Sequence, residues 1–487
     1  MAQRALLRCE GLVLGAGAAG LAAARELRAA GLGRALVLEA RQRVGGRCHT
    51  SDELGSGVPL DHGAQWIHGL SDEHPMAQLA NELGVKTSRQ MDGGGILAHS
   101  DGDAPQMTDE RRARDAFRRL SPAVQAAMSA GPAGDCSWLD ALQRYADPRE
   151  PVEALFGGEA SARQRALLNL RVYFEYENFE GARLDRWSAC NGDTIPCLEG
   201  PNADVDGGYG TLISRLAEGL DVRFGRKVIS VRYPGEGMEE AAEVEVRCVA
   251  QDPEGRETEE VYLAPFCVVA LPLGVLRSGA VSFAPPLPAC KAEAVARLGV
   301  TLMDKVELLW ETRWWARSVG SLRIASTESS LTFHPWPWFV EPKAARGHPL
   351  GYAVLVCFVT GRFAEELAVL EVQEVEGRCL EALRHAFPAT DIPKPAAVHA
   401  TRWGRDPCSL GSWTYLAIGS SLADASALAQ SVGRSGCMAF AGEHCCDGSQ
   451  EGLDMGTVHG AFLSGQLAAR GFASRRADCE VPGWPGG

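Results

Sequence analysis

The sequence predicts an α/β protein with more than one domain, and two observations lead to this prediction. The chain has 487 residues, which is too many for a single hydrophobic core. Residues 11–40 read as an apolar strand, a glycine-rich turn, an alanine- and leucine-rich helix, and a second strand that ends in an acid. This order is typical of a dinucleotide-binding unit. We therefore expect two or three domains, which can be interleaved along the chain.

Each part of the predicted unit has a physical role. Gly15 permits the tight turn, Gly17 lets the backbone approach a pyrophosphate, and Gly20 lets the helix pack closely on the sheet. The N-terminus of that helix then faces the phosphates. Glu39, 19 residues after Gly20, is placed to accept hydrogen bonds from the adenosine ribose. An acid at this position disfavours a 2′-phosphate.

A second glycine turn follows at Gly45 and Gly46, between Arg41, Arg43 and Arg47, whose guanidinium groups can neutralise a diphosphate. The pattern E-x-x-x-R-x-G-G-R, followed by "DHGAQWIHG", resembles the FAD-containing amine oxidase superfamily of polyamine oxidases, monoamine oxidases and lysine-specific histone demethylases. Further stretches resemble the same family in the same order, at residues 206–220, 267–276, 401–421 and 440–470.

The resemblance implies an α/β and α+β architecture, in which a Rossmann-like FAD-binding domain is interleaved with a substrate-binding domain of mixed sheet and flanking helices. The expected FAD-binding segments are 1–75, 200–285 and 396–471, the expected substrate-binding segments are 76–199 and 286–395, and 472–487 reads as a flexible tail. The implied FAD contacts are Gly15, Gly17, Ala18, Ala19, Gly20, Glu39, Ala40, Arg41, Gly45, Gly46, Arg47, Gly63, Ala64, Gln65, Trp66, Val228, Trp403, Gly442, Glu443, Thr457 and Val458.

Lys305 lies at the centre of "RLGVTLMDKVELLW", residues 297–310, which reads as a strand. From the strand alone, Lys305 is interpreted as a solvent-facing residue of an edge strand, on the same face as Glu307. In the amine oxidase family, a lysine on a substrate-domain strand reaches the flavin and holds a water against N5. Lys305 matches that position, so the resemblance implies that it helps O2 to reoxidise the reduced flavin.

The resemblance assigns further roles around the flavin. Trp413 matches one wall of an aromatic cage, and Thr457 stands where several members carry the opposite aromatic, which leaves the cage half open. His68 matches a histidine near the active-site entrance, and Glu177 best matches an acid that holds a distal ammonium. A histidine packed in a turn and a solvated helix face are the alternatives. Ser412 replaces the cysteine to which monoamine oxidases attach FAD, so non-covalent FAD is expected.

Composition narrows the partners and the compartment. The formal net charge of −14 and the pI near 5.4 argue against nucleic acid or an anionic membrane as a partner. The 15 cysteines include no CxxC pair, and the apolar stretch 11–24 is too short to span a bilayer. Neither a leader at the start nor a peroxisomal signal at the end is present, so we expect cytoplasmic localisation. His444, Cys445, Cys446 and His459 fit no common zinc template, and no metal is expected.

The chemistry that the resemblance implies is hydride transfer from the carbon next to the substrate nitrogen to flavin N5, followed by reoxidation by O2 to give hydrogen peroxide. A polyamine oxidase acting on a small cationic amine is expected. An L-amino acid or monoamine oxidase, a histone lysine demethylase and a non-oxidase flavoprotein remain alternatives. A carboxylate substrate would require an arginine near the flavin, and the sequence identifies none. The oligomeric state is open, and a monomer is compatible with the sequence. His62 departs from the family pattern, because an apolar residue is usual there.

Overall fold

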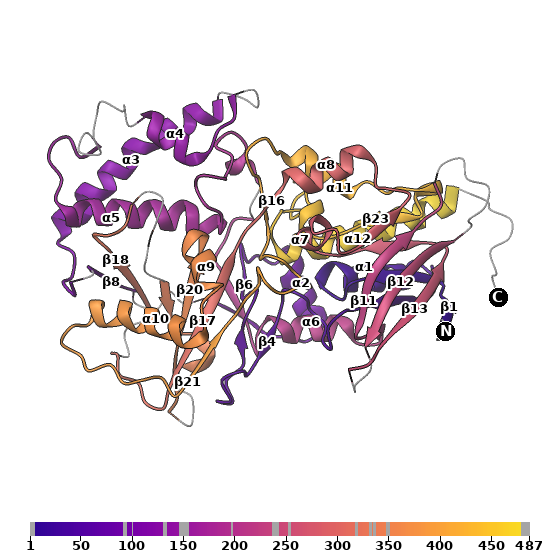
Figure 1. Ribbon diagram of the computed structural model, residues 1–487, viewed down its shortest axis with the longest axis horizontal. Coiled ribbons are helices and arrows are strands. Elements are labelled where there is room, and N and C mark those ends of the chain that lie inside the picture. The colour runs from indigo at the N-terminus through magenta and orange to yellow at the C-terminus, as the bar shows by residue number, and fades with distance from the viewer. Residues whose placement is uncertain are drawn as a thin grey trace.

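The computed structural model describes residues 5–478, with gaps at 91–94, 100, 130–133, 146–154, 196–197, 236–242, 252–254, 317–319, 331–333, 335–337 and 347–350. The molecule is elongated, and two groups of sheets and helices lie along its long axis (Figure 1). The first strand, β1 (Ala5–Arg8), and the last helix, α12 (Val458–Asp478), both belong to the right-hand group. Of the helices in the described ranges, none is long and apolar enough to cross a membrane.

A five-stranded parallel sheet forms the centre of the right-hand group. Its strands, in spatial order, are β10 (Asp221–Arg223), β3 (Ala35–Leu38), β2 (Gly11–Leu14), β14 (Cys267–Val269) and β23 (Met438–Phe440). All residues of the last four are buried, as expected for parallel strands covered on both faces. Helix α1 (Ala18–Ala29) joins β2 to β3, so the strand–helix–strand unit predicted at 11–40 is present.

Helix α1 forms because alanine and leucine dominate its sequence, and it ends where Gly31 takes a φ of 69°, a conformation that favours glycine. Helix α12 packs along one flank of α1. A Cβ on Gly465 of α12 would lie 2.0 Å from the carbonyl oxygen of Ala19, so glycine is required where the two helices meet. Residues 472–478, expected in a flexible tail, continue α12, and 479–487 lie outside the described residues.

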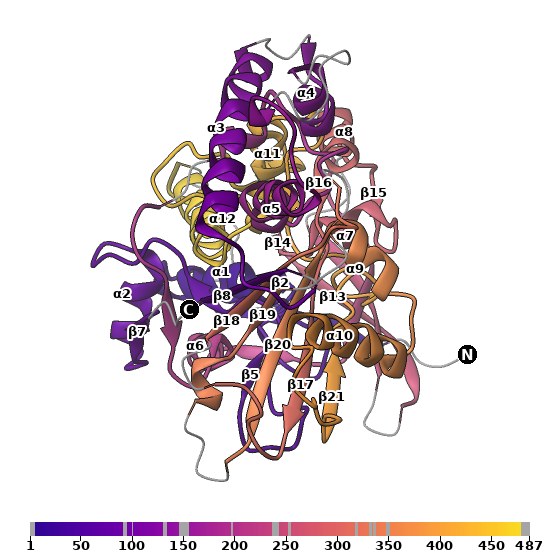
Figure 2. The same ribbon diagram turned by 90° about the vertical axis from the view of Figure 1, so that its left-hand side faces the viewer.

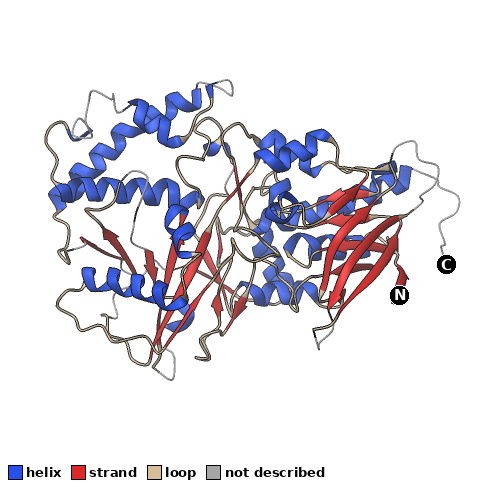
Figure 3. Ribbon diagram, in the orientation of Figure 1, coloured by secondary structure: helices blue, strands red, loops and turns tan. Residues whose placement is uncertain are grey.

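A second sheet lies beside the parallel one, with strands in the order β1, β13 (Glu257–Ala264), β12 (Val244–Gln251), β11 (Arg226–Arg232) and β15 (Ser282–Ala284). Alternate residues of β12 are buried, as expected for a strand with one covered face. Leu12 and Leu14 of the parallel sheet share one apolar cluster with Val246 and Tyr262 of this sheet. The two sheets, whose strands are red in Figure 3, are therefore held together by a common core.

The left-hand group is built on a six-stranded mixed sheet. Its strands, in spatial order, are β21 (Ala397–Ala400), β17 (Met303–Trp310), β20 (Ala353–Thr360), β19 (Trp338–Val340), β18 (Ser321–Ala325) and β8 (Gly95–His99). The β18–β8 pair is parallel and the other pairs are antiparallel. Because β21 pairs with β17, residues 397–400 belong to this sheet. They fall within the segment 396–471 that the sequence predicts to bind FAD.

Helices cover the mixed sheet in two layers. Helices α9 (Gly361–Leu367) and α10 (Val372–Ala386) pack against β17 and β20 through a shared apolar core. Helices α3 (Met107–Ser129), α4 (Trp138–Tyr145) and α5 (Ala162–Val172) form a separate helical layer, with α5 next to β18 (Figure 2). A π-helical turn, η3 (Tyr173–Asn178), continues α5 toward the centre of the molecule.

Short elements connect the two groups. The small sheets consist of β4 (Thr50–Ser51) with β5 (Leu60–Asp61), β16 (Gly299–Val300) with β22 (Thr414–Tyr415), and β6 (Trp66–Ile67) with β9 (Ala203–Val205) and β7 (Thr87–Arg89). The remaining helices are α2 (Pro75–Glu82), α6 (Tyr209–Ala217), α7 (Leu273–Arg277), α8 (Ala289–Arg297), α11 (Leu422–Ala429) and the single turns η4 (Gly192–Thr194), η5 (Lys343–Ala345), η6 (Arg434–Gly436) and η7 (Glu443–Cys445).

The packing of α1 gives a direct test of the fold. A Cβ on Gly20 would lie 1.9 Å from the backbone oxygen of Gly15, which cannot move without opening the turn. We expect Gly20→Ala to destabilise the protein by about 1 to 3 kcal/mol. Gly377→Ala in α10 is the matched control, because nothing lies within 4 Å of its Cβ, and it should stabilise by about 0.5 to 1 kcal/mol. Thermal unfolding measures both, and equal shifts in the two variants would contradict the close packing.

Candidate active site

A cavity of about 770 Å³ opens between the two groups. Its lining includes residues that follow parallel strands directly or closely: Gly15 after β2, Glu39 after β3, Ala270 after β14 and Gly442 after β23. Ligands of α/β proteins bind at this carboxyl edge of the sheet, and sites for cofactors and small ligands measure about 300 to 1,000 Å³. The cavity therefore has the position and the size of a cofactor and substrate site.

The cavity brings together most of the residues predicted from the sequence. All of the predicted FAD contacts except Gly20 line it, as do Lys305, Trp413, His68 and Thr457. Gly20 lies behind the first turn of α1, where it packs on Gly15.

Two helix N-termini open on the cavity. Helix α1 begins at Ala18, and its N-cap residue Gly17 has no side chain to satisfy the first amide groups. Helix α12 begins at Val458. The hydroxyl of Thr457 accepts from the Gly460 amide at 3.0 Å and donates to the Asp454 carbonyl at 2.8 Å, so it caps this helix. Both helix ends present partial positive charge to the same cavity, which suits an anionic ligand.

The three arginines around the second glycine turn contribute unequally to the positive potential of the cavity. Arg41 forms an ion pair with Asp406 at 2.6 Å, and Arg47 forms one with Glu443 at 2.8 Å, so each pair is formally neutral. Arg43 instead donates to the carbonyl oxygen of Gly46 at 2.9 Å, and burial together with Arg41 lowers its pKa. Arg43 does not line the cavity, yet its charge lies directly behind the Gly45–Gly46 turn. The helix N-termini and this charge, more than the paired arginines, supply the positive potential.

Glu39 is held rigidly at the end of β3. One of its carboxylate oxygens accepts from the Ala16 amide and the other from the Arg41 amide, both at 2.8 Å. The side chain is 4% exposed, and each oxygen keeps a lone pair that can accept a further hydrogen bond. This geometry fits the ribose contact that the sequence predicts for Glu39.

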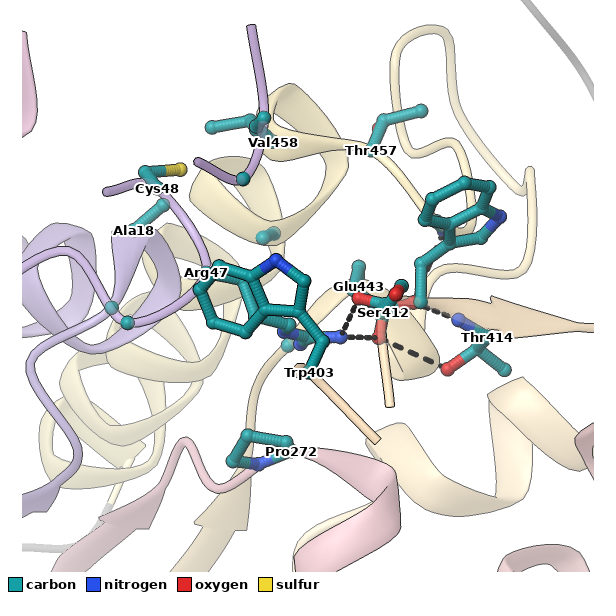
Figure 4. A pocket seen from close by; sticks show the side chains of 18 of the residues that line it. Ala18, Arg47, Cys48, Pro272, Trp403, Ser412, Thr414, Glu443, Thr457 and Val458 are labelled. Carbon is teal, nitrogen blue, oxygen red and sulfur yellow. Dashed lines mark hydrogen bonds and ion pairs between the residues drawn. The ribbon is translucent and has the colours of Figure 1, made fainter. Parts of the chain in front are cut away.

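The side chain of Glu443 joins its own segment to those of Arg47, Thr414 and Gly456. Its carboxylate accepts from Arg47 at 2.8 Å, from the Thr414 hydroxyl at 3.0 Å and from the Thr414 and Gly456 amides at 3.2 Å (Figure 4). Burial alone would raise its pKa, but Arg47 and the nearby hydrogen bonds leave the pKa below its ordinary value. Arg47 also donates to the Ser412 carbonyl at 2.9 Å, which fixes the segment before Trp413.

Lys305 is 3% exposed, and every residue of β17 after Met303 is buried. The interpretation as a solvent-facing edge residue is therefore wrong. Its ammonium donates to the carbonyls of Asp61 and Gly63 and to the Gln65 side chain, at 2.5, 2.9 and 2.8 Å. An ammonium has three donors, and all three are used. Burial lowers its pKa to about 8, although the nearby carboxylates of Asp61 and Glu307 act to raise it.

The segment that carries Trp413 is fixed by short contacts. The Ser412 hydroxyl donates to the Met303 carbonyl and accepts from the Met303 amide, both at 2.9 Å. A Cβ on Gly181 would lie 2.6 Å from the indole of Trp413, and one on Gly456 would lie 3.0 Å from it. Glycine at these two positions therefore makes room for the ring, which lines the cavity.

His68 faces the cavity and accepts or donates one hydrogen bond, to the Asn202 side chain at 2.9 Å. Its ring is exposed to the cavity but enclosed by protein, and this burial lowers its pKa. Burial therefore favours the uncharged imidazole, which can accept a hydrogen bond from a ligand.

Glu177 does not line the cavity. It lies in the π-helical turn η3 and is 4% exposed, and its carboxylate packs on Gly361, where a Cβ would come within 2.1 Å. Burial raises its pKa to about 8, which Arg183 only partly offsets. Its neighbours Glu175 and Glu180 line the cavity instead. A π-turn bonds residues i and i+5, so its faces differ from those of an α-helix, and no motif in the sequence marks this change.

One wall of the cavity is not predicted from the sequence. Trp66, Trp338 and Phe358 pack with ring centroids 5.0 to 6.1 Å apart, and the ammonium of Lys305 lies 5.0 Å from the Phe358 ring. At the other end, the guanidinium of Arg323 lies 4.5 Å from the Phe174 ring and 5.9 Å from the Trp338 ring. Trp66 was predicted, but no motif marks the other residues, which come from separate strands and the π-turn.

The model of the family described as flavin containing amine oxidoreductase matches residues 18–471. The chain belongs to this family. This amine oxidoreductase is 30% identical over 468 residues to polyamine oxidase 4 of Oryza sativa subsp. japonica, an alignment that covers 94% of this chain and 87% of the rice protein. It is also 30% identical to lysine-specific histone demethylase 1 homolog 2 of Arabidopsis thaliana, where the alignment covers 93% of this chain and 57% of the demethylase.

Among solved structures, putrescine oxidase bound to putrescine shares the fold of the amine oxidoreductase, with a TM-score of 0.70 and 20% identity over 96% of this chain and 100% of that one. The predicted family and fold class are confirmed, and the protein is an enzyme that acts on CH–NH groups. The family implies FAD. The uncapped end of α1, the glycine turns, Glu39 and the capped end of α12 form a cradle that fits it.

The Arg47–Glu443 pair tests how the amine oxidoreductase holds this cradle together. Removing one partner of a buried ion pair costs about 3 to 5 kcal/mol, because the other charge is left unpaired. We expect Glu443→Gln to lower the thermal midpoint and the amount of FAD retained through gel filtration. Glu82→Gln is the control, since Glu82 pairs with Arg25 at the surface, where such a pair contributes at most about 1 kcal/mol. Wild-type FAD content in Glu443→Gln would contradict the assignment.

Proposed function

We propose that this amine oxidoreductase is a polyamine oxidase that uses non-covalent FAD and O2. The observation that carries the proposal is the arrangement of the cavity, in which Lys305 and Trp413 lie on walls lined by aromatic rings, while Glu175 and Glu180 line the same cavity. A long apolar amine with a distal ammonium suits such a cavity. Its reacting nitrogen can lie among the rings while the distal charge meets an acid.

The apolar walls serve the chemistry as well as binding. An amine gives up hydride only when its nitrogen is neutral, because the lone pair must stabilise the developing iminium. Trp66, Trp338 and Phe358 exclude water, and a dry site favours the neutral form of an amine. Bound FAD supplies the acceptor for the hydride. Burial lowers the pKa of His68, so its uncharged imidazole can accept a hydrogen bond from the substrate nitrogen but is too weak a base to hold that nitrogen's proton.

Lys305 is proposed to act after hydride transfer. In the structure its three donors are occupied, and only the bond to Gln65 goes to a side chain that can rotate away. Turning Gln65 away would free one N–H for a water without disturbing the two backbone carbonyls. The ammonium charge, which the pKa of about 8 allows near neutral pH, then stabilises negative charge that develops as O2 is reduced.

Non-covalent attachment is supported by the thiols near the cavity. Ser412 occupies the position before Trp413, and the cavity-lining cysteines are Cys48 and Cys408. Burial raises the pKa of Cys48 to about 12, and burial also raises the pKa of Cys408. The thiolate is the nucleophilic form of cysteine, so neither residue is poised to attack a flavin.

The substrate class can be tested directly with the FAD-loaded protein. We expect peroxide from spermine, spermidine or their N1-acetyl derivatives, and little from benzylamine or L-amino acids. Glu175→Gln and Glu180→Gln should raise the KM for these polyamines by about tenfold, since a cavity-facing charge pair contributes about 1 kcal/mol or more. Turnover of L-amino acids alone would refute the proposal. Flavin bleaching by polyamines without peroxide would show a dehydrogenase.

A second candidate is an oxidase of amines that carry a carboxylate, and Arg323 is the observation that favours it. Its guanidinium lines the cavity between the Phe174 and Trp338 rings, and no carboxylate of the described residues lies within ion-pair distance of it. Arginine binds carboxylates through paired hydrogen bonds. The cavity lining thus contains both the cation of Arg323 and the acids Glu175 and Glu180. Arg323 would select a substrate with a carboxylate, and the acids would select one with a distal ammonium.

Substituting Arg323 separates the two candidates. Under the second candidate, Arg323→Gln lowers kcat/KM for carboxylate-bearing amines by about tenfold or more, because a charge-assisted hydrogen bond is lost. Under the first, the same change leaves polyamine turnover intact or improves it by removing a repulsive charge, and this is the outcome we expect. Arg171→Gln is the control, since Arg171 lies near Arg323 but does not line the cavity.

A further inference from the structure

His62, which departs from the family pattern, lies in a buried cluster that the proposed reaction does not use. Its Nδ1 atom lies 2.8 Å from one carboxylate oxygen of Glu307, and Nδ1 of His399 lies 3.0 Å from the other. Glu307 is 0% exposed and His62 is 2% exposed, while His399 is partly accessible. The carboxylate therefore has two imidazole partners and no contact with water.

The cluster is electrostatically consistent with an ionised carboxylate between two N–H donors. Burial alone would raise the pKa of Glu307, but the two histidines bring it down to about 2. Burial acts to lower the pKa of His399, and the hydrogen bond to Glu307 overcomes it, so the pKa is raised. A buried carboxylate is stable only when it is paired in this way.

The cluster shares two chain segments with Lys305. Glu307 is two residues from Lys305 on β17, and His62 lies between Asp61 and Gly63, whose carbonyls accept from the Lys305 ammonium. Residues 61–65 are thus attached to β17 at two points, through the ammonium and through the His62 imidazole. His399 stands directly opposite Glu307 in the β17–β21 pair. The indole of Trp403 adds a third attachment by donating to the His62 carbonyl at 3.0 Å.

We propose that His62, Glu307 and His399 form a positioning relay that holds residues 61–65 against β17 and so keeps the Lys305 ammonium aimed at the flavin. His62 lines the cavity, but Ser51 and Glu307 engage both nitrogens of its ring, and neither Glu307 nor His399 lines the cavity, so we treat the three as positioning residues. The inference rests on the proposed role of Lys305. Its structural part, the attachment of 61–65, does not depend on which amine is oxidised.

The relay has an electrostatic consequence for Lys305. The negative charge of Glu307 favours the ammonium form, so its removal lowers the pKa of Lys305 further below the usual value. The other charged or titratable groups that face the relay and Lys305 are Asp61, Glu53 and His49. They are unchanged by a substitution at Glu307, and a shift in the titration of Lys305 can therefore be attributed to that carboxylate.

Hydrogen–deuterium exchange on the FAD-loaded protein tests the attachment without any substrate. The amides of His62 and Ala64 donate to backbone oxygens at 2.8 and 3.1 Å, and they report local opening of this segment. In Glu307→Gln we expect them to exchange about tenfold faster, as a charge-assisted hydrogen bond is lost. Glu341→Gln is the matched control. Glu341 is also buried, and its carboxylate is paired with Arg313 and Arg346 and not with a group of residues 61–65, so exchange at that segment should stay at the wild-type rate.

A second readout separates positioning from a merely structural role. Dithionite-reduced enzyme is mixed with O2 over a range of pH, which needs no amine. The pH at which the reoxidation rate changes should move to lower pH in Glu307→Gln and stay in place in Glu341→Gln. His399→Gln, at a partly accessible position, should shift exchange and rate in the same direction by less. Wild-type exchange and an unmoved pH profile in both relay variants would overturn the proposal. Slow reoxidation of the wild type would count against the oxidase, not the relay.

One further outcome would also overturn the relay. The ligand atoms of His62, Glu307 and His399 lie within 4.8 Å of one another, and two histidines with one carboxylate can bind a divalent metal ion. Elemental analysis of the purified holoenzyme distinguishes the two. The relay predicts no stoichiometric zinc, iron or manganese. A full equivalent that is lost in Glu307→Gln would replace the relay with a metal centre.

Discussion

The structure depends most on the accommodation of one buried cation. Lys305 is placed in the interior by a strand that is buried on both faces, and a buried ammonium is stable only if its three donors find acceptors. The segment 61–65 supplies all of them, two from its backbone and one from Gln65. This requirement fixes the segment between β17 and the cofactor cradle. The same segment therefore contributes Gly63, Ala64 and Gln65 to the cavity lining.

Paired side chains and helix ends play different electrostatic roles around the cavity. Where a guanidinium meets an acid, as in Arg47–Glu443 and Arg41–Asp406, the pair joins distant segments and adds little net charge. The attraction for an anionic cofactor then comes from the ends of α1 and α12, where backbone amides carry the partial charge. The substrate half is built differently, from the rings of Trp66, Trp338 and Phe358, with the Lys305 ammonium and the Arg323 guanidinium packed against them. That contrast suits a charged dinucleotide on one side and a neutral amine nitrogen on the other.

The local motifs were sufficient to predict the cofactor half. The strand, turn and helix at 11–40 depend on residues that are close in sequence, and so do the turn at Gly45 and the caps around Glu443. The substrate half depends on contacts between distant residues. Strand alternation could not show that Lys305 and Glu307 are buried, because a partner for each lies about 240 residues away, in segment 61–65. Glu177 lies in the π-turn and does not line the cavity, and no sequence motif contains Arg323. His62 differs from the residue usual in the family, but only the fold shows that it pairs with Glu307.

The most direct test of the account is the titration of Lys305 in the holoenzyme. The chain has only six lysines, so a protein labelled with 13C at the lysine ε-carbons gives few signals, and Lys305→Met assigns one of them. Lys291 is an internal reference: it is buried and held by carbonyls at the end of α11, its pKa is also near 8, and it does not line the cavity. We expect the Lys305 signal to titrate near pH 8 and to shift when the flavin is reduced, while the Lys291 signal does not shift on reduction. A Lys305 signal that does not change with the redox state of the flavin would contradict the proposed role of Lys305.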